Sequence, residues 1–272
     1  MIIKFSKYQG TGNDFIMIDN RSEEHVFKGE LVARLCHRRF GIGADGLILL
    51  QNHHESDFEM IYFNSDGNLG SMCGNGGRCI VSFANSCGIT KDEYCFKASD
   101  GTHQALIKRG NPDNVKLKMK DVSQIAKRVD LWFADTGSPH VVIKMDKIDE
   151  LDLIKVGREI RYSDEFAEEG VNVNVTEVRN SILAVRTYER GVENETFSCG
   201  TGVTAVSLIA VRNKWIIPSG NFVDIDTPGG SLRVHFKEEQ NRFTDIWLEG
   251  PAALVYTGEF DADDLSHRIV IK

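Results

Sequence analysis

The sequence contains the same unusual segment twice: a cysteine, then a glycine-rich turn, then a long apolar run. The first copy is SMCGNGGRC at 71–79, which continues into IVSFA at 80–84. The second is SCGTG at 198–202, which continues into VTAVSLIA at 203–210. A polar, glycine-rich turn before such a run predicts the start of a buried helix. Each copy therefore predicts a cysteine at a helix N-terminus, and Cys73 and Cys199 are 126 positions apart (199 − 73).

Shorter matches recur at nearly the same offset and in the same order. TGNDF at 11–15 corresponds to TGSPH at 136–140, GADGLI at 43–48 to GVNVNV at 170–175, and YFNS at 62–65 to YERG at 188–191. Each match is weak alone, but an ordered series at one spacing indicates an internal duplication. A chain of 272 residues is long enough for two such domains.

The hydrophobic pattern predicts the fold class. Alternating or fully apolar segments at 4–8, 15–19, 47–50 and 57–63 predict strands, and helical spacing predicts a helix over 29–39. We expect an α+β protein of two pseudo-symmetric repeated domains, each a curled, mostly antiparallel sheet around a central helix, with the active site in the cleft between them. The expected N-terminal repeat is 1–120, joined by a C-terminal strand within 263–272, and the C-terminal repeat is 121–262.

Composition excludes several classes of protein. The 40 acidic and 32 basic residues give a net charge of −8, which argues against a nucleic-acid partner. The N-terminus predicts no signal peptide, and no apolar run is long enough to span a membrane. We expect a cytoplasmic protein whose six cysteines are reduced and bind no metal, since none of them forms a C-x-x-C pair. A homodimer is compatible with the sequence.

The paired cysteines predict a specific chemistry. A helix N-terminus favours the thiolate form of a cysteine and offers backbone N–H groups to an anion. Two facing sites of this kind could hold one carboxylate and place a sulfur on either face of its α-carbon. One sulfur would remove the α-proton while the other returns a proton to the opposite face, which inverts the stereocentre without a cofactor. The sequence leaves open which sulfur is the thiolate.

The motifs resemble those of the diaminopimelate epimerase family. The resemblance rests on MCGNGGRC at 72–79, GNDF at 12–15, YERG at 188–191 and SCGTG at 198–202, and it extends over essentially the whole chain. It implies a cofactor-independent isomerase that converts LL-diaminopimelate to meso-diaminopimelate, a precursor of lysine and peptidoglycan. The related proline racemases share the paired cysteines but usually carry histidine where this chain has Asn75, which favours the epimerase.

The resemblance also implies roles for individual residues. Cys73 and Cys199 are the acid/base pair, and His140 and Glu189 tune them. The remaining residues are expected to bind substrate: Gly74, Asn75, Gly200 and Thr201 hold the reacting carboxylate through backbone N–H groups, and Asn13, Asn64, Ser138, Asn172, Glu189 and Arg190 bind the other polar groups.

Two positions depart from the family pattern. Ser138 stands where an asparagine is usual, and Gly46 stands where a glutamine is common. Both departures are expected to loosen substrate contacts or admit a water. Neither touches the acid/base pair.

Alternative interpretations remain open. Cys36, Cys87 and Cys95 are expected to be core thiols, and Cys79 a packing residue one turn into its helix. A proline-type racemase of the same fold is the enzymatic alternative. An anion-binding or redox-sensing protein with reactive thiols is the non-enzymatic one.

Overall fold

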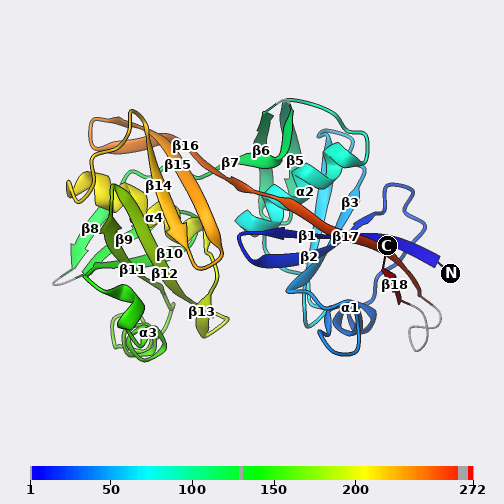
Figure 1. The fold of residues 1–272 in the computed structure, drawn as a ribbon, viewed down its shortest axis with the longest axis horizontal. Helices are drawn as coiled ribbons and strands as arrows, with labels where there is room; N and C mark the ends of the chain where they lie inside the picture. The colour runs from blue at the N-terminus through cyan, green and yellow to red at the C-terminus, as the bar shows by residue number, and fades with distance from the viewer. Residues whose placement is uncertain (1, 109, 129–130, 263–268, 272) are drawn as a thin grey trace. The chain divides into compact units, whose positions relative to one another are not determined.

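The computed structural model describes all residues except 1, 109, 129–130, 263–268 and 272 (Figure 1). The chain divides into two compact units, residues 1–117 with 251–272 and residues 118–250. Each unit is a mostly antiparallel sheet that surrounds one long helix (Figure 1). The expected α+β class with two repeated halves is confirmed.

Unit 1 contains two helices and a sheet. Its helices are α1 (Gly29–Cys36) and α2 (Gly74–Ser86). Its strands are β1 (Ile2–Gly10), β2 (Asn13–Asp19), β3 (Gly46–Gln51), β4 (Phe58–Asn64), β5 (Glu93–Ala98), β6 (Gly101–Lys108), β7 (Asn111–Lys118), β17 (Ala253–Asp261) and β18 (Ile269–Ile271). The helix expected over 29–39 ends at Cys36, because the chain doubles back and brings Gly41 against the carbonyl oxygens of Arg34 and Leu35.

Unit 2 repeats this order. Its helices are α3 (Leu153–Arg161), α4 (Gly200–Arg212) and the short 3-10 helix η1 (Ile148–Glu150). Its strands are β8 (Ile125–Arg128), β9 (Leu131–Asp135), β10 (Pro139–Lys144), β11 (Asn172–Arg179), β12 (Ile182–Glu189), β13 (Asn194–Thr196), β14 (Phe222–Thr227), β15 (Gly230–Glu239) and β16 (Arg242–Pro251).

Strand pairing is the same in the two units. The parallel pairs β2–β3 and β4–β5 of unit 1 correspond to β10–β11 and β12–β14 of unit 2. The antiparallel pair β1–β17 corresponds to β9–β8. The C-terminal strand β17 therefore fills in unit 1 the place that β8 fills in unit 2. The chain returns to unit 1 earlier than the boundary expected at 262, and residues 263–268 and 272 of the expected return lie outside the described residues.

The strand registers correct two sequence correspondences. Phe15 pairs with Gly46 and His140 pairs with Asn172, so matching Phe15 to His140 places Ile48 at Asn174 and not at Val175. Tyr62 lies opposite Ile48 and Thr187 opposite Asn174, so Tyr62 corresponds to Thr187 and not to Tyr188. A shift of one residue reverses the face of a strand. Tyr188 accordingly packs on α3 beside Gly157.

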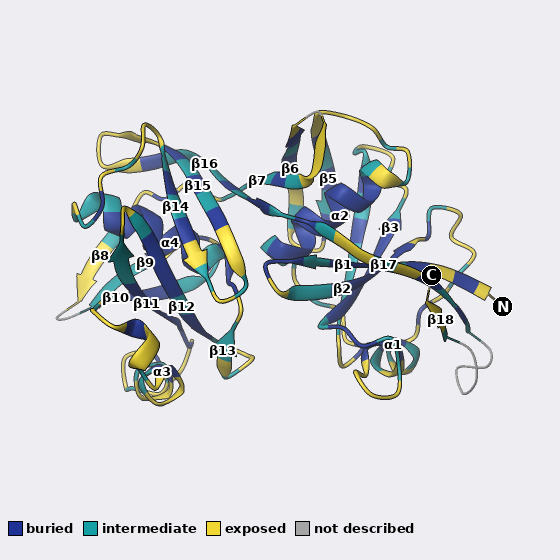
Figure 2. Ribbon diagram, in the orientation of Figure 1, coloured by how far each residue is buried: buried dark blue, intermediate teal, exposed yellow. Residues whose placement is uncertain are grey.

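The long helices form the centre of each unit. Residues 75–84 of α2 and nearly all of residues 200–210 of α4 are buried, as the dark ribbons of Figure 2 show. In unit 2 the α4 side chains Val203, Val206 and Ile209 share a core cluster with the sheet residues Val234 and Leu248. This burial fixes the start of each helix, and with it the position of each cysteine.

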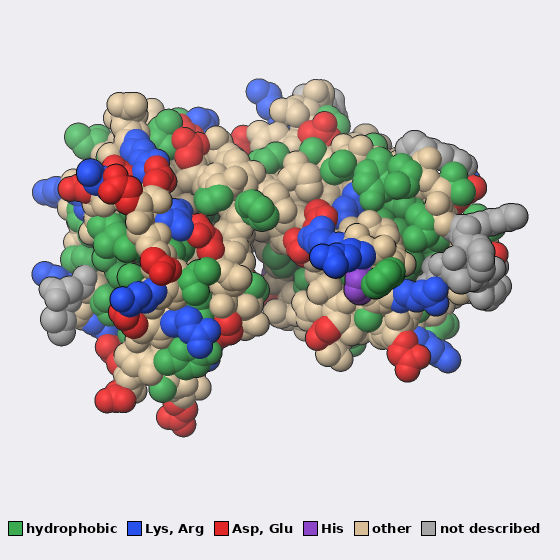
Figure 3. Space-filling model, turned by 60° about the horizontal axis from the view of Figure 1, so that its bottom comes forward, with side chains coloured by type: hydrophobic (Ala, Val, Ile, Leu, Met, Phe, Trp, Pro, Cys, Tyr) green, Lys and Arg blue, Asp and Glu red, His purple; other side chains and the backbone are tan. Residues whose placement is uncertain are grey.

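The outer surface carries charges of both signs. On the face drawn in Figure 3, basic and acidic side chains are interspersed within each unit. None of the helices built from the described residues is long and apolar enough to cross a membrane.

Candidate active site

Both predicted cysteines cap a helix. Cys73 and Cys199 have extended backbone conformations, and their carbonyl oxygens accept the first helical hydrogen bonds, from Gly77 N at 2.7 Å and Val203 N at 2.9 Å. Within the described residues, neither helix start has a side-chain cap. The N–H groups of the first helical residues therefore have no partner within their own helix, and they carry the positive end of the helix dipole.

In unit 1, Asn13 lies beside the sulfur of Cys73. Asn13 Oδ1 is 3.6 Å from Cys73 Sγ and also accepts a hydrogen bond from Asn75 Nδ2 at 3.3 Å. Asn13 Nδ2 donates to Asp45 Oδ2 at 2.7 Å. A carboxylate only accepts hydrogen bonds, so Asp45 fixes which end of the Asn13 amide faces the cysteine.

A charged network holds Asp45 in place. Arg38 bridges Asp45 and Asp14 with distances of 2.6 and 2.7 Å, and Lys7 contacts Asp14 at 2.7 Å. Burial alone would raise the pKa of Asp14, but hydrogen bonds from Arg38 and Lys7 hold it well below its usual range. Asp14 is therefore ionised, and it holds the Arg38 guanidinium together with Asp45.

Arg78 fixes the second amide of this half-site. It is fully buried in α2 and donates to Asn75 Oδ1 at 3.0 Å and to Thr11 Oγ1 at 3.2 Å. It also donates to the carbonyl oxygens of Gly74 and Pro251. Burial lowers the pKa of Arg78, and charge interactions with Cys79 and Cys73 oppose that shift. The guanidinium thus orients Asn75 and places a buried positive charge near Cys73.

In unit 2, a directed chain of hydrogen bonds reaches the sulfur of Cys199. Asn174 Nδ2 donates to Val141 O and lies 3.1 Å from His140 Nδ1. The nitrogen of Asn174 thus faces the ring, so His140 Nδ1 accepts and Nε2 carries the proton. His140 Nε2 then donates to Thr201 Oγ1 at 2.8 Å, so the Thr201 hydroxyl can donate its own proton to Cys199 Sγ, 3.4 Å away.

Burial keeps this histidine neutral. His140 is fully buried, and desolvation lowers its pKa to about 3. The hydrogen-bonded residues can pack this closely because position 202 is a glycine: a Cβ there would lie 2.5 Å from Asn174 Oδ1. The two half-sites therefore offer different groups to the sulfurs: an amide oxygen faces Cys73, and a hydroxyl that can donate or accept faces Cys199.

Asn172, the first residue of β11, connects the segment at Ser138 and Pro139 with the segment at Arg190. Its Nδ2 donates to Ser138 Oγ at 2.9 Å and to Pro139 O at 3.1 Å, and its Oδ1 accepts from Arg190 N at 2.9 Å. Asn172 is only 3% exposed, so its contacts position Ser138 and Arg190. The Arg190 guanidinium donates to Glu169 O at 2.8 Å and remains partly exposed. Burial raises the pKa of the neighbouring Glu189 carboxyl.

The two departures have different structural surroundings. Ser138 is held by Asn172. Beside Gly46 there is no empty space, because a Cβ there would lie 2.5 Å from Tyr62 Cε2 and from Phe63 O. Asn64 ends β4 opposite Gly46, on the same face as Tyr62. The aromatic ring of Tyr62 therefore occupies the volume that a longer side chain at position 46 would need.

Within each unit, the structure brings most predicted residues together. Asn13, Cys73, Gly74 and Asn75 are adjacent in unit 1, as are His140, Cys199, Gly200 and Thr201 in unit 2. Sequence reasoning missed the supporting residues Thr11, Asp45, Arg78 and Asn174. Two signals were available: Arg78 is a charge within an apolar helix, and Asn174 lies two residues from Asn172 on the same face of a strand.

The other cysteines lie in different surroundings. Cys36 and Cys79 are buried, and desolvation raises the pKa of each thiol to about 12. Burial also raises the pKa of Cys87. All six cysteines are free thiols. These three raised pKa values argue against Cys36, Cys79 and Cys87 as bases near neutral pH.

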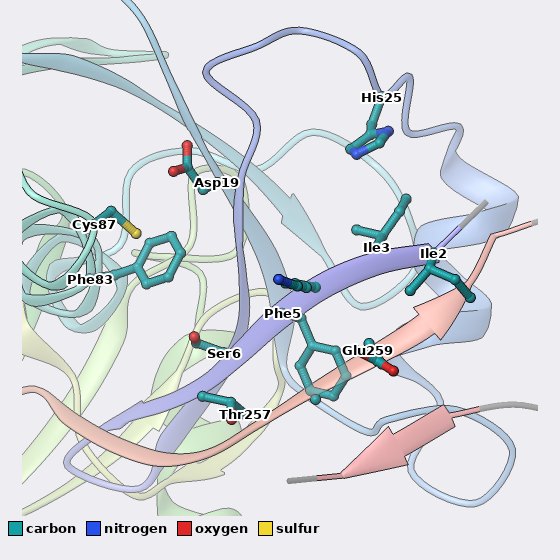
Figure 4. Close-up of a pocket in the computed structure, with 12 residues that line it drawn as sticks. Ile2, Ile3, Phe5, Ser6, Asp19, His25, Phe83, Cys87, Thr257 and Glu259 are labelled. Carbon is teal, nitrogen blue, oxygen red and sulfur yellow. The ribbon is translucent and has the colours of Figure 1, made fainter.

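A pocket of about 600 Å³ in unit 1 lies away from these residues (Figure 4). Its walls come from β1, β17 and the C-terminal part of α2, where Phe83 and Cys87 point toward β1. This is the opposite end of α2 from Cys73. Its described lining residues include none of the predicted site residues.

The comparisons with known proteins confirm the resemblance. The family model described as diaminopimelate epimerase matches residues 5–125 and 132–255. The diaminopimelate epimerase of Flavobacterium psychrophilum is 48% identical over 258 residues, covering 93% of this chain and 98% of that protein. The diaminopimelate epimerase of Chlorobaculum tepidum is 42% identical over 257 residues, covering 92% and 98%.

Solved structures of low sequence identity share the fold. A PhzF-family phenazine biosynthesis protein of Bacillus anthracis aligns with a TM-score of 0.76 at 13% identity, covering 96% of this chain and 99% of that one. A probable proline racemase of Agrobacterium radiobacter aligns with a TM-score of 0.67 at 15% identity, covering 94% and 92%. These structures support the two-domain fold, and the match of sequence over both units decides the family. The chain belongs to the diaminopimelate epimerase family.

Proposed function

We propose that this protein is an isomerase that interconverts LL- and meso-diaminopimelate without a cofactor, with Cys73 and Cys199 as the acid/base pair. The observation that carries the proposal is the pair of helix starts, each with a cysteine at its N-cap position before a buried glycine-rich first turn. The match to the family over both units supports the substrate. The reaction needs free thiols, which agrees with a cytoplasmic setting.

The proposed reaction moves two protons. A thiolate on one side removes the α-proton, and the electron pair of the C–H bond passes into the substrate as a carbanion. The thiol on the other side then protonates the opposite face of the α-carbon. The two sulfurs exchange protonation states, and exchange with solvent or the reverse reaction restores them.

We further propose that the resting proton lies on Cys73 and that Cys199 is the thiolate. Asn13 offers an acceptor to Cys73, which favours S–H, whereas Thr201 offers a donor to Cys199, which favours S⁻. The buried positive charge of Arg78 stabilises the Cys73 thiolate after Cys73 has given up its proton. Asn13 and Arg78 thus support the two protonation states that Cys73 must adopt during turnover.

Substrate groups are assigned to the same elements. Backbone N–H groups of Gly74 and Asn75, and of Gly200 and Thr201, would hold the carboxylate at the reacting carbon and stabilise its charge in the carbanionic transition state. The Arg190 guanidinium would take the distal carboxylate. Asn13, Asn64, Ser138, Asn172 and Glu189 are proposed to contact the remaining polar groups, and Asn172 also positions Ser138 and Arg190.

The test is epimerisation in deuterated water without pyridoxal phosphate or added metal. The wild-type protein should convert LL-diaminopimelate to the meso form and incorporate one deuterium at the inverted carbon. Cys73→Ala and Cys199→Ala should each lower kcat by at least about 10³-fold, whereas the control Cys95→Ala should retain activity. Full activity in either of the first two variants would exclude the two-cysteine mechanism.

A proline-type racemase is the second candidate, because structures of that group share the fold. Proline and 4-hydroxyproline should give no turnover if Arg190 binds a second carboxylate. Turnover under reducing conditions also separates the enzyme from a redox-sensing protein, which would need its thiols to be oxidised.

A further inference from the structure

The side chain of Tyr62 leans along the sheet toward the end that carries the proposed substrate residues. Its backbone lies opposite Ile48, yet its hydroxyl lies beside Gly46, which pairs with Asn64. A Cβ on Gly46 would lie 3.1 Å from that hydroxyl oxygen. The hydroxyl of Tyr62 therefore lies two residues along the sheet from its own backbone, next to the Gly46–Asn64 pair.

A second glycine, Gly70, lies against the opposite edge of the Tyr62 ring. A Cβ on Gly70 would lie 2.5 Å from both Tyr62 Cδ1 and Cε1, and 3.1 Å from Asn64 Oδ1. The ring also makes an edge-to-face contact with Phe15, with centroids 6.0 Å apart and planes at 78°. Gly46, Gly70 and Phe15 together fix the ring, so the hydroxyl occupies a defined position.

That position belongs to the half-site of Cys73. Gly46 pairs with both Phe15 and Asn64, so these residues share the face of the sheet that α2 covers. Asn13 lies two residues before Phe15, on the same face of β2. The hydroxyl thus lies among the amides assigned to substrate, in a side chain that is only partly buried.

We propose that Tyr62 is a substrate-binding residue, whose hydroxyl makes a hydrogen bond to a charged group of diaminopimelate. Gly46 and Gly70 lack side chains because the ring occupies that space. This inference rests on the proposed function, since it names a further contact in the same site. Tyr62 binds the substrate and takes no part in proton transfer, so its loss affects binding more than turnover.

The test is Tyr62→Phe, which removes the hydroxyl and leaves the ring. The KM for LL-diaminopimelate should rise about ten-fold, with kcat within about two-fold of wild type. A KM within about two-fold of wild type, in a preparation whose wild-type protein epimerises diaminopimelate, overturns the inference and leaves the proposed function intact. Inactive wild-type protein would instead contradict the proposed function.

Tyr94→Phe is the matched control in the same unit. The Tyr94 hydroxyl donates to Ile89 O and accepts from Asn85 Nδ2, both at 2.8 Å, at the C-terminal end of α2. Its removal should lower the melting temperature and leave KM unchanged. An equal rise of KM in both variants would show that Tyr62 acts only through stability, which also overturns the inference.

Gly70→Ala tests the role of the glycine. The added methyl group should displace the ring and raise KM in the parent chain. In the Tyr62→Phe background the same change should raise KM by a smaller factor than in the parent chain, because the part of its effect that acts through the hydroxyl is already absent. Effects that multiply in full would show that Gly70 acts independently of Tyr62.

Discussion

The amide oxygen of Asn13 faces the sulfur of Cys73 across 3.6 Å, while its nitrogen is held by Asp45 at 2.7 Å. An oxygen in this place accepts the thiol proton and disfavours a thiolate. The orientation is not a property of Asn13 alone, because an isolated amide can rotate by half a turn. It depends on the carboxylate of Asp45, which is outside the set of predicted substrate contacts.

Asp45→Asn should therefore impair catalysis from outside the acid/base pair. The new amide can donate as well as accept, so Asn13 is free to turn its nitrogen toward Cys73. We expect kcat/KM to fall about ten-fold, equivalent to about 1.4 kcal/mol. Asp19→Asn is the matched control, since Asp19 ends β2, the strand that begins at Asn13, and pairs with Arg21 at 2.6 Å. Equal kcat/KM values for Asp45→Asn and the wild-type protein would show that the orientation of Asn13 is unimportant.

Thr201→Val should shift the pH dependence of the reaction. Thr201 Oγ1 lies 3.4 Å from Cys199 Sγ, and a donor there stabilises the thiolate. Its removal raises the pKa of the base, so the acidic limb of kcat/KM should move up by about one pH unit. Thr201→Ser keeps the hydroxyl and should leave the limb in place. An unmoved limb in Thr201→Val would place the resting thiolate elsewhere.

His140 should make the protein less stable in acid. Its pKa is lowered by burial to about 3, below the value of about 6.5 in an unfolded chain. Between these values the unfolded state binds the extra proton, so the free energy of unfolding falls as the pH drops from about 6.5 toward 3, by at most about 1.4 kcal/mol per unit.

Urea unfolding at pH 7 and pH 5 checks this contribution. His140→Gln retains a donor toward Thr201 and cannot titrate, so its stability should change less between the two pH values than that of wild type. An identical pH dependence in the two proteins would show that His140 is not the group responsible.

Much of the fold could be predicted from the sequence because the signals were local. The apolar runs after Cys73 and Cys199 are too long and too uniform for a surface helix, and they did form the two central helices. The offset of the cysteines also holds for the helices themselves, Gly74–Ser86 and Gly200–Arg212. Such features need only the chemistry of neighbouring residues.

The remaining features depend on contacts between distant segments. The return of β17 to β1 follows from pairing at the edge of the sheet, which no local pattern encodes. The contact of the Tyr62 ring with Gly46 can be predicted only when the register of β3 and β4 is known. Likewise, the contacts of Asn172 with Ser138 and Arg190 join segments that are far apart in the sequence.

Arg78→Met should test the buried cation in α2. The variant removes the guanidinium donor from oxygens of Thr11, Asn75, Gly74 and Pro251, and Asn75 Oδ1 keeps the longer contact with Thr11 Oγ1 at 3.4 Å. Buried acceptors that lose a donor are costly. We expect a loss of about 3 kcal/mol in the free energy of unfolding. We also expect a lower kcat, because Asn75 no longer holds one orientation and Cys73 loses a nearby positive charge. Urea unfolding and steady-state kinetics measure the two effects separately.

Arg34→Met, at an exposed position of α1, should change neither quantity. Unchanged stability in Arg78→Met would mean that water satisfies those oxygens, and unchanged kcat would mean that Asn13 alone sets the state of Cys73.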